Sequence, residues 1–325
     1  MKKYLSVMLL SGLVLSVSAQ DTKDAYLLKQ LTSDAIQHVK CETTGGNISV
    51  TGSDAGARVE VYVWASNGRN RDLSKEEIKK RLEEDYDLTV TAENHTLTAI
   101  AKPKHNFHNW NHGLSISFTI FVPHASSTDL RTSGGNIDMS SLTGTQDFGT
   151  SGGNLNVDHL SGHIKGRTSG GNITMSDLKD DIDLSTSGGS INAKDSHGTM
   201  TLTTSGGNVE LRSLDGNIKA GTSGGNVTMY NLTCTLETST SGGNIDVSIK
   251  TLGKYVRISN SGGSVSLQIP QDKGVDLNLS ADRVTASTLT GFKGDVKKDR
   301  IEGTINGGSI PVTVHGGSNI HFSIK

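Results

Sequence analysis

The pentapeptide Thr-Ser-Gly-Gly-Asn recurs seven times in this chain at an unbroken spacing of eighteen residues. Its first glycine stands at positions 134, 152, 170, 188, 206, 224 and 242. The only departure inside the pentapeptide is Ser190, which replaces asparagine in the fourth copy, and a further copy at residues 260–264 follows after twenty residues. A spacing that never slips indicates that every repeat is one identical structural turn.

Each repeat also carries apolar residues that alternate with polar ones. In the third copy these are Ile173, Met175, Leu178, Ile182 and Leu184. Alternation with a period of two is typical of a short strand with one buried face. The second half of the repeat echoes the first nine residues later, so the underlying unit is a duplicated nonapeptide of strand and turn.

Such short strands, joined by glycine turns without helices, predict an all-β fold, a single parallel β-helix or solenoid with 18-residue coils. Each strand would pair in parallel with a strand about 4.8 Å away in the next coil. Eighteen residues give a coil perimeter of no more than about 60 Å. This allows two or three short faces around a thin core.

The constant spacing within the chain predicts a role for the residues of the pentapeptide. The Gly-Gly pair is predicted to form a corner at positive φ, where a β-carbon would clash. The asparagines are expected to stack at this corner, with their amides hydrogen bonded along the ladder. They are Asn136, Asn154, Asn172, Asn208, Asn226 and Asn244.

One outward column of the repeat is charged. It runs Asp147, Lys165, Asp183, Thr201, Lys219 and Glu237. Opposite charges mostly alternate between adjacent coils, and such cross-strand pairs stabilise by roughly 0.2–1 kcal/mol each. We interpret this column as a structural ladder, with a charged ligand groove as the alternative.

The two ends of the chain depart from the regular repeat. An isolated repeat copy at residues 39–50 precedes longer alternating strands and a short helix near residues 74–85, opened by Ser74 with Glu77 as a capping box and by Leu73 with Ile78 as a hydrophobic staple. Residues 20–130 are therefore expected to form strand-rich wider coils and an N-terminal cap. Residues 131–270 form the regular solenoid, and residues 271–325 form the C-terminal coils and cap.

Residues 1–19 are interpreted as a secretory signal peptide. Lys2 and Lys3 precede an apolar run from Leu5 to Val17, and small residues lead to cleavage after Ala19. Removing the two lysines lowers Lys+Arg from 31 to 29 against 33 Asp+Glu. A mildly acidic chain gives no electrostatic reason to expect nucleic acid or anionic lipid as a partner. No later stretch predicts a transmembrane segment, so periplasm, outer cell surface or secretion is expected.

The chain has two cysteines, Cys41 and Cys234. A disulfide needs Cα atoms within about 7 Å, and these residues belong to repeat copies several turns apart. We expect two buried free thiols.

The Gly-Gly ladder, the signal peptide and the closing sequence I-N-G-G-S-I-P-V-T-V-H-G-G-S-N-I at residues 305–320 together resemble a bacterial family. It is a family of secreted β-strand-repeat proteins described as adhesins, whose domain has no established function, and the resemblance covers residues 36–325. It implies a parallel β-helix exported to the cell envelope with an adhesive role. It carries no catalytic or ligand-binding residues with it.

A calcium-binding β-roll is the strongest alternative, because its nonapeptide also makes two strands per eighteen residues. The column that would have to bind calcium is Asp138, Asn156, Thr174, Asn192, Glu210, Thr228 and Asp246. Ca²⁺ takes 6–8 oxygen ligands, and this column lacks a repeating carboxylate. The residues therefore predict no cofactor and no metal site in the ladder.

A histidine-rich segment outside the ladder leaves open whether the chain binds a metal ion there. His105, His108 and His112 have a spacing that would align three imidazoles on a helix for Zn²⁺ or Cu²⁺. Pro103 and Gly113 instead favour an exposed loop, in which Phe107 and Trp110 are candidates for a local contact site.

An enzyme is the other alternative, because some parallel β-helices cleave acidic polysaccharides. Those sites need clustered carboxylates and basic residues on loops that interrupt the coil, and the seven regular copies contain no insertion. We therefore expect no catalytic residues. The predicted function is a non-enzymatic β-solenoid that binds an unknown glycan or protein at a surface, with polymerisation into a filament left open.

Overall fold

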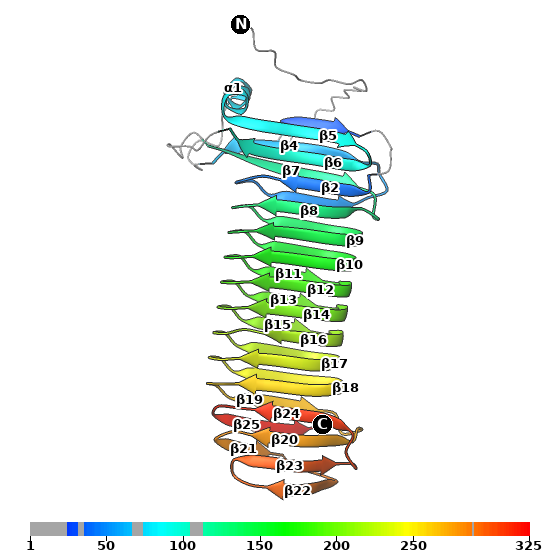
Figure 1. Ribbon diagram of the computed structural model, residues 1–325, viewed down its shortest axis with the longest axis vertical. Coiled ribbons are helices and arrows are strands. Elements are labelled where there is room, and N and C mark those ends of the chain that lie inside the picture. The colour runs from blue at the N-terminus through cyan, green and yellow to red at the C-terminus, as the bar shows by residue number, and fades with distance from the viewer. Residues whose placement is uncertain (1–24, 32–35, 67–73, 105–112, 288) are drawn as a thin grey trace.

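The chain folds into a long, narrow rod of β-strands (Figure 1). The computed structural model describes residues 25–31, 36–66, 74–104, 113–287 and 289–325. Within these ranges the chain forms twenty-five strands and one helix. The predicted all-β solenoid is confirmed, because strands eighteen residues apart pair in parallel along the rod, as Ile173 with Ile191 and Ile182 with Met200.

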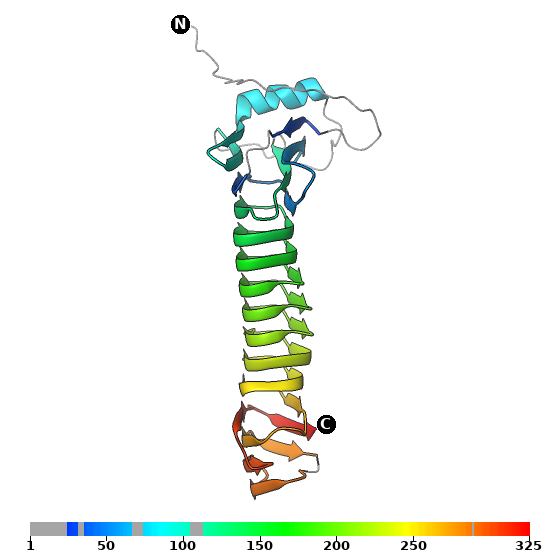
Figure 2. The same cartoon turned by 90° about the vertical axis from the view of Figure 1, so that its right-hand side faces the viewer.

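Each regular coil contributes to two faces, which Figure 2 shows as opposite sides of the rod. The short face contains β11 (Ile173–Ser176), β13 (Ile191–Lys194) and β15 (Val209–Arg212). The long face contains β12 (Lys179–Thr186), β14 (His197–Thr204) and β16 (Asp215–Gly221). In the neighbouring coils one strand runs through both faces, as in β9 (Ile137–Thr150), β10 (Leu155–Thr168), β17 (Val227–Thr240) and β18 (Ile245–Asn260).

The predicted inward residues fill the space between the two faces. Ile173, Met175, Leu178, Ile182 and Leu184 are each no more than 1% exposed. Replacing one such side chain with alanine typically costs about 2–5 kcal/mol. The two extra residues before the copy at 260–264 are absorbed within β18, whose pairing with β17 shifts register.

The glycine pair of the motif has a different role from the one predicted. Among the described residues at positive φ, no glycine of the Thr-Ser-Gly-Gly-Asn copies is found, so the expectation of a left-handed corner was wrong. The second glycine is needed for close backbone approach instead. A β-carbon on Gly189 would lie 2.0 Å from the carbonyl oxygen of Gly171 in the preceding coil, whereas one on Gly188 would lie 3.4 Å from its nearest neighbour.

A column of left-handed residues lies at the opposite corner, between the short and the long face. Its members are Ser141, His159, Asp177, Asp195, Ser213 and Asn231, with φ between 49° and 60°. A second column at positive φ follows three residues later, at Gly144, Gly162, Asp180, Gly198 and Gly216. Asn and Asp tolerate this conformation better than most residues because their short polar side chains bond locally. Five of these six residues are therefore small and polar, His159 being the exception, and the corner directs them outward at regular intervals along the rod.

The asparagine column forms the predicted ladder, although its partners are backbone groups. Oδ1 of Asn154 accepts a 2.8 Å hydrogen bond from the N–H of Asn172 in the next coil. Where Ser190 replaces asparagine, its N–H donates to Asn172 Oδ1 at 2.8 Å, and its own Oγ accepts from the N–H of Asn208 at 3.1 Å. The single departure from the motif therefore keeps the ladder intact.

The threonine of the motif is buried and hydrogen bonded twice. Oγ1 of Thr186 donates to the carbonyl of Gly171 at 2.8 Å and accepts from the N–H of Gly189 at 3.3 Å. The same pair of bonds recurs at Thr150, Thr168, Thr204, Thr222 and Thr240. Each threonine thus ties its own turn to the carbonyl of the coil before it.

At the N-terminal end, strand order in space differs from strand order in the sequence. The isolated repeat copy forms β2 (His38–Glu42) and β3 (Ile48–Gly52). β2 lies between β6 (Thr96–Pro103) and β8 (Ser127–Thr132), and β3 lies between β7 (Leu114–Val122) and β9. The first repeat copy is therefore an internal coil of the rod.

Antiparallel strands and the helix close this end. β4 (Arg58–Ala65) pairs antiparallel with β7 and with β1 (Leu27–Gln30), and β5 (Tyr86–Glu93) pairs antiparallel with β6. Helix α1 (Lys75–Asp85) contacts β5. The predicted helix start is confirmed, because Oγ of Ser74 accepts from the N–H of Glu77, whereas Leu73 lies outside the described residues. No helix in the described part of the chain is long and apolar enough to cross a membrane.

The C-terminal end repeats the same arrangement. β24 (Ile310–His315) lies in parallel between β18 and β20 (Val275–Ser280), and β25 (Asn319–Ile324) lies in parallel between β19 (Val265–Ile269) and β21 (Arg283–Ala286). The end of the rod is made by β22 (Phe292–Val296) and β23 (Arg300–Ile305), paired antiparallel (Figure 1). The last coil of the sequence is therefore an internal coil.

Candidate functional site

Two shallow polar grooves lie on the regular coils. The first, the short-face groove, has a volume of about 250 Å³ and crosses β3, β9, β10 and β11. Its polar lining is Ser49, Asp138, Ser140, Asn156, Asp158, Thr174 and Ser176. The second, the corner groove, has a volume of about 370 Å³ and follows the Thr-Ser-Gly turn over four coils.

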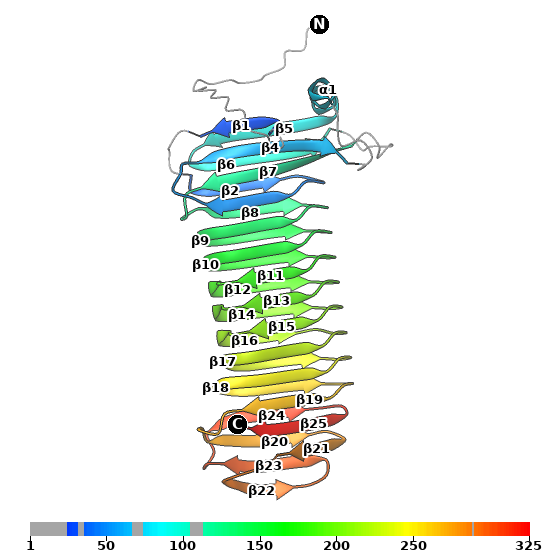
Figure 3. The same cartoon turned by 180° about the vertical axis from the view of Figure 1, so that it is seen from behind.

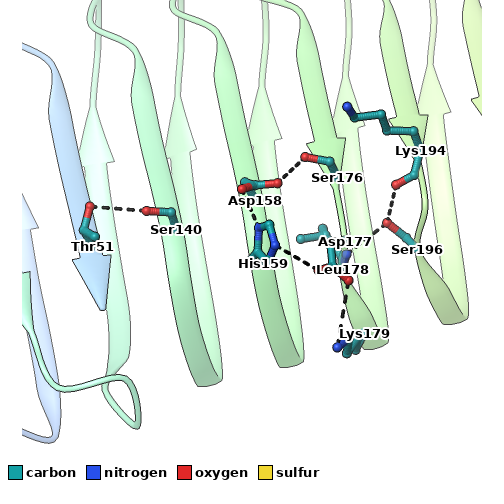
Figure 4. A network of polar contacts seen from close by, with 10 residues as sticks. All are labelled: Thr51, Ser140, Asp158, His159, Ser176, Asp177, Leu178, Lys179, Lys194 and Ser196. Atoms are coloured by element: carbon teal, nitrogen blue, oxygen red, sulfur yellow. Dashed lines mark hydrogen bonds and ion pairs between the residues drawn. The ribbon is translucent and has the colours of Figure 1, made fainter. Parts of the chain in front are cut away.

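Many polar groups of the short-face groove hydrogen bond to one another. Nδ2 of Asn156 donates to Oδ1 of Asp138 at 2.7 Å, and Oγ of Ser140 donates to Oγ1 of Thr51 at 3.3 Å. Ser176 donates to Asp158 (Figure 4). Much of the hydrogen-bonding capacity of this groove is therefore used within the protein.

A histidine between two carboxylates borders the short-face groove. Nδ1 of His159 lies 2.5 Å from Oδ2 of Asp158, and its Nε2 lies 3.1 Å from Oδ2 of Asp177 in the next coil (Figure 4). The hydrogen bond from Ser176 lowers the pKa of the Asp158 carboxyl, partial burial opposes this, and His159 and Lys194 lower it further. These groups are substantially exposed to solvent, so the ion pairs contribute little to stability.

The corner groove combines hydroxyls that are already hydrogen bonded with hydroxyls that are not. Its floor consists of the buried threonines, whose hydroxyls are committed to backbone groups. Its rim carries Ser169, Ser187, Ser205, Ser185 and Thr203, whose side chains have no hydrogen-bond partner among the described residues. Both donors and acceptors on this rim are therefore available to a ligand.

The charged column pairs less simply than the sequence predicted. Lys219 bonds to Glu237 at 3.0 Å, as expected for adjacent coils. Asp147 instead pairs with Arg131 at 2.9 Å, and Asp183 lies 3.8 Å from Arg167. Sequence reasoning missed both arginines, although each stands one residue before the threonine of its motif. These pairs support a structural ladder, because the carboxylates are already neutralised.

Other predicted candidates give no additional site. Among the described residues, no group of three His, Cys, Asp or Glu side chains could hold a metal ion. His105, His108 and His112 lie outside the described residues, as do Phe107 and Trp110. The two cysteines are free and buried, as predicted. Burial raises the pKa of Cys234 to about 12 and raises that of Cys41 well above its usual range.

Coils that stack in register make this chain a parallel β-solenoid. The glycine ladder and the two closed ends together account for almost the whole chain. The chain belongs to the Toastrack DUF4097 family, whose match spans residues 15–319. This is a domain family of unknown function. No curated protein matches the chain.

Several solved structures resemble this chain at low identity. A "putative adhesin" from Parabacteroides distasonis ATCC 8503 is 11% identical, with a TM-score of 0.42 over 91% of this chain and 96% of that chain. A "putative lipid binding protein" from the same organism is 13% identical, with a TM-score of 0.38 over the same shares. A "putative adhesin" from Bacteroides fragilis NCTC 9343 is 13% identical, with a TM-score of 0.30 over 91% and 96%. At these values the overall shapes diverge, so the similarities carry no functional argument.

Proposed function

We propose that this protein is an exported, non-enzymatic β-solenoid that binds a ligand at a cell or matrix surface, as an adhesin does. The corner groove carries this proposal, because its rim presents uncommitted hydroxyls in successive coils. The signal-like residues 1–19 support export.

Binding through such a groove would be distributed over several coils. A single hydrogen bond contributes a net of about 0.5–1.5 kcal/mol, so one serine alone is a weak ligand contact. Identical contacts repeated in register would add when one ligand spans several coils, by the same effective-concentration argument that gives linked sites their avidity. A rigid ladder also keeps these contacts preorganised, which lowers the entropy cost of binding.

The polar cluster on the short face supports a non-catalytic function. In a nucleophilic triad the serine bonds to the histidine, and the histidine bonds to a carboxylate. Here Ser176 bonds to Asp158 rather than to His159, so the histidine cannot take its proton. Among the described residues, the polar side-chain partners of the histidine are two carboxylates, and neither is a serine, threonine or cysteine.

A glycan and host-matrix array probed with residues 20–325 tests the proposal. A triple variant, S169A/S187A/S205A, should weaken binding to any ligand found, because it removes three rim hydroxyls. A matched variant, T228A/S266A, removes two hydroxyls from the short face and should bind as the unmodified chain does. Equal binding by all three proteins would contradict a role for the corner groove, and release of reducing ends from a polysaccharide panel would contradict the non-enzymatic assignment.

A further inference from the structure

A surface of different chemistry lies at the N-terminal end of the rod. There β4 lies between β1 and β7, and it pairs antiparallel with each of them (Figure 3). Alternate residues of β4 from Val59 to Val63 are buried in the core, so the residues between them face outward. Those outward residues are Arg58, Glu60, Tyr62 and Trp64.

Two of these residues form an aromatic stack. The ring centroids of Tyr62 and Trp64 are 5.7 Å apart, and the ring planes are within 5° of parallel. Their partners across the strand pair are small, since Ser117 lies opposite Tyr62 and Ser115 lies opposite Trp64. Both serines are bonded to a neighbouring turn, Ser117 accepting from the N–H of Asn47 and Ser115 donating to the carbonyl of Gly45, and their short side chains cannot reach over the rings.

A compact polar network adjoins the stack. Nε of Arg58 donates to Oε1 of Glu60 at 3.0 Å, and the hydroxyl of Tyr62 donates to Oε2 of Glu60 at 2.8 Å. The guanidinium carbon of Arg58 lies 3.5 Å from the ring centroid of Phe121, which is its partner on β7. The charges of Arg58 and Glu60 cancel, while several N–H donors of the guanidinium and carboxylate lone pairs are left for further bonds.

Tyr62 and Trp64 are half-buried, and more exposed apolar residues on β1 and just before it extend the same surface. Leu28 pairs with Glu60 and is 49% exposed, and Tyr26, which is 38% exposed, bonds through its N–H to the carbonyl of Val61. The whole chain has only 14 Phe, Trp and Tyr residues, yet four of them, Tyr26, Tyr62, Trp64 and Phe121, gather here. We call this surface the aromatic strip. Such a concentration is typical of a recognition surface, because aromatic rings provide large, rigid contact area.

We propose that the aromatic strip binds a pyranose ring of a neutral oligosaccharide. A sugar ring has a flat face of C–H groups and a rim of hydroxyls. The C–H face would lie against the face of Trp64 that is turned away from the stack with Tyr62, and hydroxyls of the same oligosaccharide would bond to the Arg58–Glu60 pair, whose net charge of zero favours a neutral ligand. This rests on the proposed function, since it names the ligand class of a surface-binding protein and a second place where that ligand is held.

The chain offers a direct spectroscopic test, because Trp64 and Trp110 are its two tryptophans. In the variant W110F of residues 20–325, all tryptophan fluorescence comes from Trp64. Titration with cello-, chito-, malto- and manno-oligosaccharides should give a saturable emission change with at least one of them. Calorimetry would then measure the affinity for the same ligand in variants of the otherwise unmodified chain. Tyr62→Ala should weaken binding by about tenfold, and the conservative Trp64→Phe should weaken it by less.

Tyr230 provides the matched control. It is 39% exposed on the short face of the rod, far along the sequence from the strip, so Tyr230→Ala should leave oligosaccharide binding unchanged. Circular dichroism of each variant would show that the rod is still folded. Trp64→Phe keeps an aromatic ring, so it serves as the test if Tyr62→Ala fails to fold.

Three outcomes would overturn the inference. One is the absence of any saturable change in Trp64 emission. Another is an apo emission that acrylamide cannot quench, because Trp64 would then be covered by the chain itself. The third is binding of peptides but of no oligosaccharide. If the array finds a ligand that depends on the corner groove and not on Tyr62, the proposed function stands and only the aromatic strip is refuted.

Discussion

Adjacent glycines of one motif should respond in opposite directions to the same substitution. In the fourth repeat copy, a β-carbon on Gly189 would lie 2.0 Å from the carbonyl oxygen of Gly171, and the contacted atom is backbone of the preceding coil. On Gly188 the nearest atom would be at 3.4 Å, an ordinary van der Waals distance. Gly188→Ala and Gly189→Ala therefore make a matched pair, with identical chemistry one residue apart.

The structure gives the size of the difference. Relieving the Gly189 clash requires the two coils to separate, which strains or breaks three hydrogen bonds between them: Thr186 to Gly171, Ser190 to Asn172, and Gly188 to Ser169. At about 1 kcal/mol each, with about 1–3 kcal/mol for overpacking, Gly189→Ala should cost about 4–6 kcal/mol. Gly188→Ala should instead stabilise by up to about 1 kcal/mol, because alanine lowers the entropy of the unfolded chain.

Guanidinium denaturation followed by far-UV circular dichroism would measure both variants. Hydrogen exchange across residues 168–207 would show whether the loss is local, since repeat proteins can lose structure one coil at a time. Equal destabilisation of the two variants would refute the close-approach argument. It would instead indicate that both glycines serve the same backbone requirement.

Four further results are expected. Thr186→Val should cost about 1–3 kcal/mol, because two buried backbone groups lose their partner, and Thr186→Ser should recover most of this loss in the same denaturation. Cys41 and Cys234 should not react with a thiol reagent at pH 8 without denaturant. Above about pH 9 the unfolded chain ionises these thiols before the folded chain does, so stability should fall as pH rises, by up to about 1.4 kcal/mol per pH unit for each thiol; Cys234→Ala should flatten this fall. Ser176→Ala should raise the pKa of Asp158 in an NMR titration, because the hydroxyl is the largest cause of its lowered pKa, and an unchanged pKa would count against that hydrogen bond.

The regular coils were predictable because each residue type meets the same environment in every repeat. Ile173 and Ile182 repeat with the period of a strand, and eighteen-residue spacing fixes which strands pair. The reason for the glycines was not predictable in the same way. A sequence shows that a β-carbon is excluded at Gly189, but positive φ and close backbone approach exclude it equally.

The ends were less predictable, because spacing does not encode which strand is a neighbour in space. The isolated copy at residues 39–50 indicated a coil, yet nothing in it places β6 and β7 on its outer side. Residues expected to form wider coils also make antiparallel pairs through β4 and β5. A hairpin and a coil present the same alternation of apolar residues, so the pattern alone cannot separate them.

The candidate sites were also only partly predictable from the sequence. The serine column of the corner groove is visible in the motif, but only the structure shows that its hydroxyls are uncommitted while the threonines beside them are bonded. The left-handed positions of His159 and Asp177 had a sequence signal, because Ser, Asp and Asn recur there. The aromatic strip had a weaker one, since Tyr62 and Trp64 alternate with buried valines.

The first and last repeat copies of the sequence lie inside the rod, between strands from other parts of the chain. The length of the rod can therefore change without changing the strands that close its ends. Both closures are self-contained, because β2 and β3 are held from both sides at one end, and β24 and β25 are held from both sides at the other. Duplicating one internal unit, such as residues 187–204, should lengthen the rod by about 4.8 Å and leave both tips unchanged. The fold is thus a spacer of adjustable reach, in which copy number sets how far the aromatic strip stands from the opposite tip.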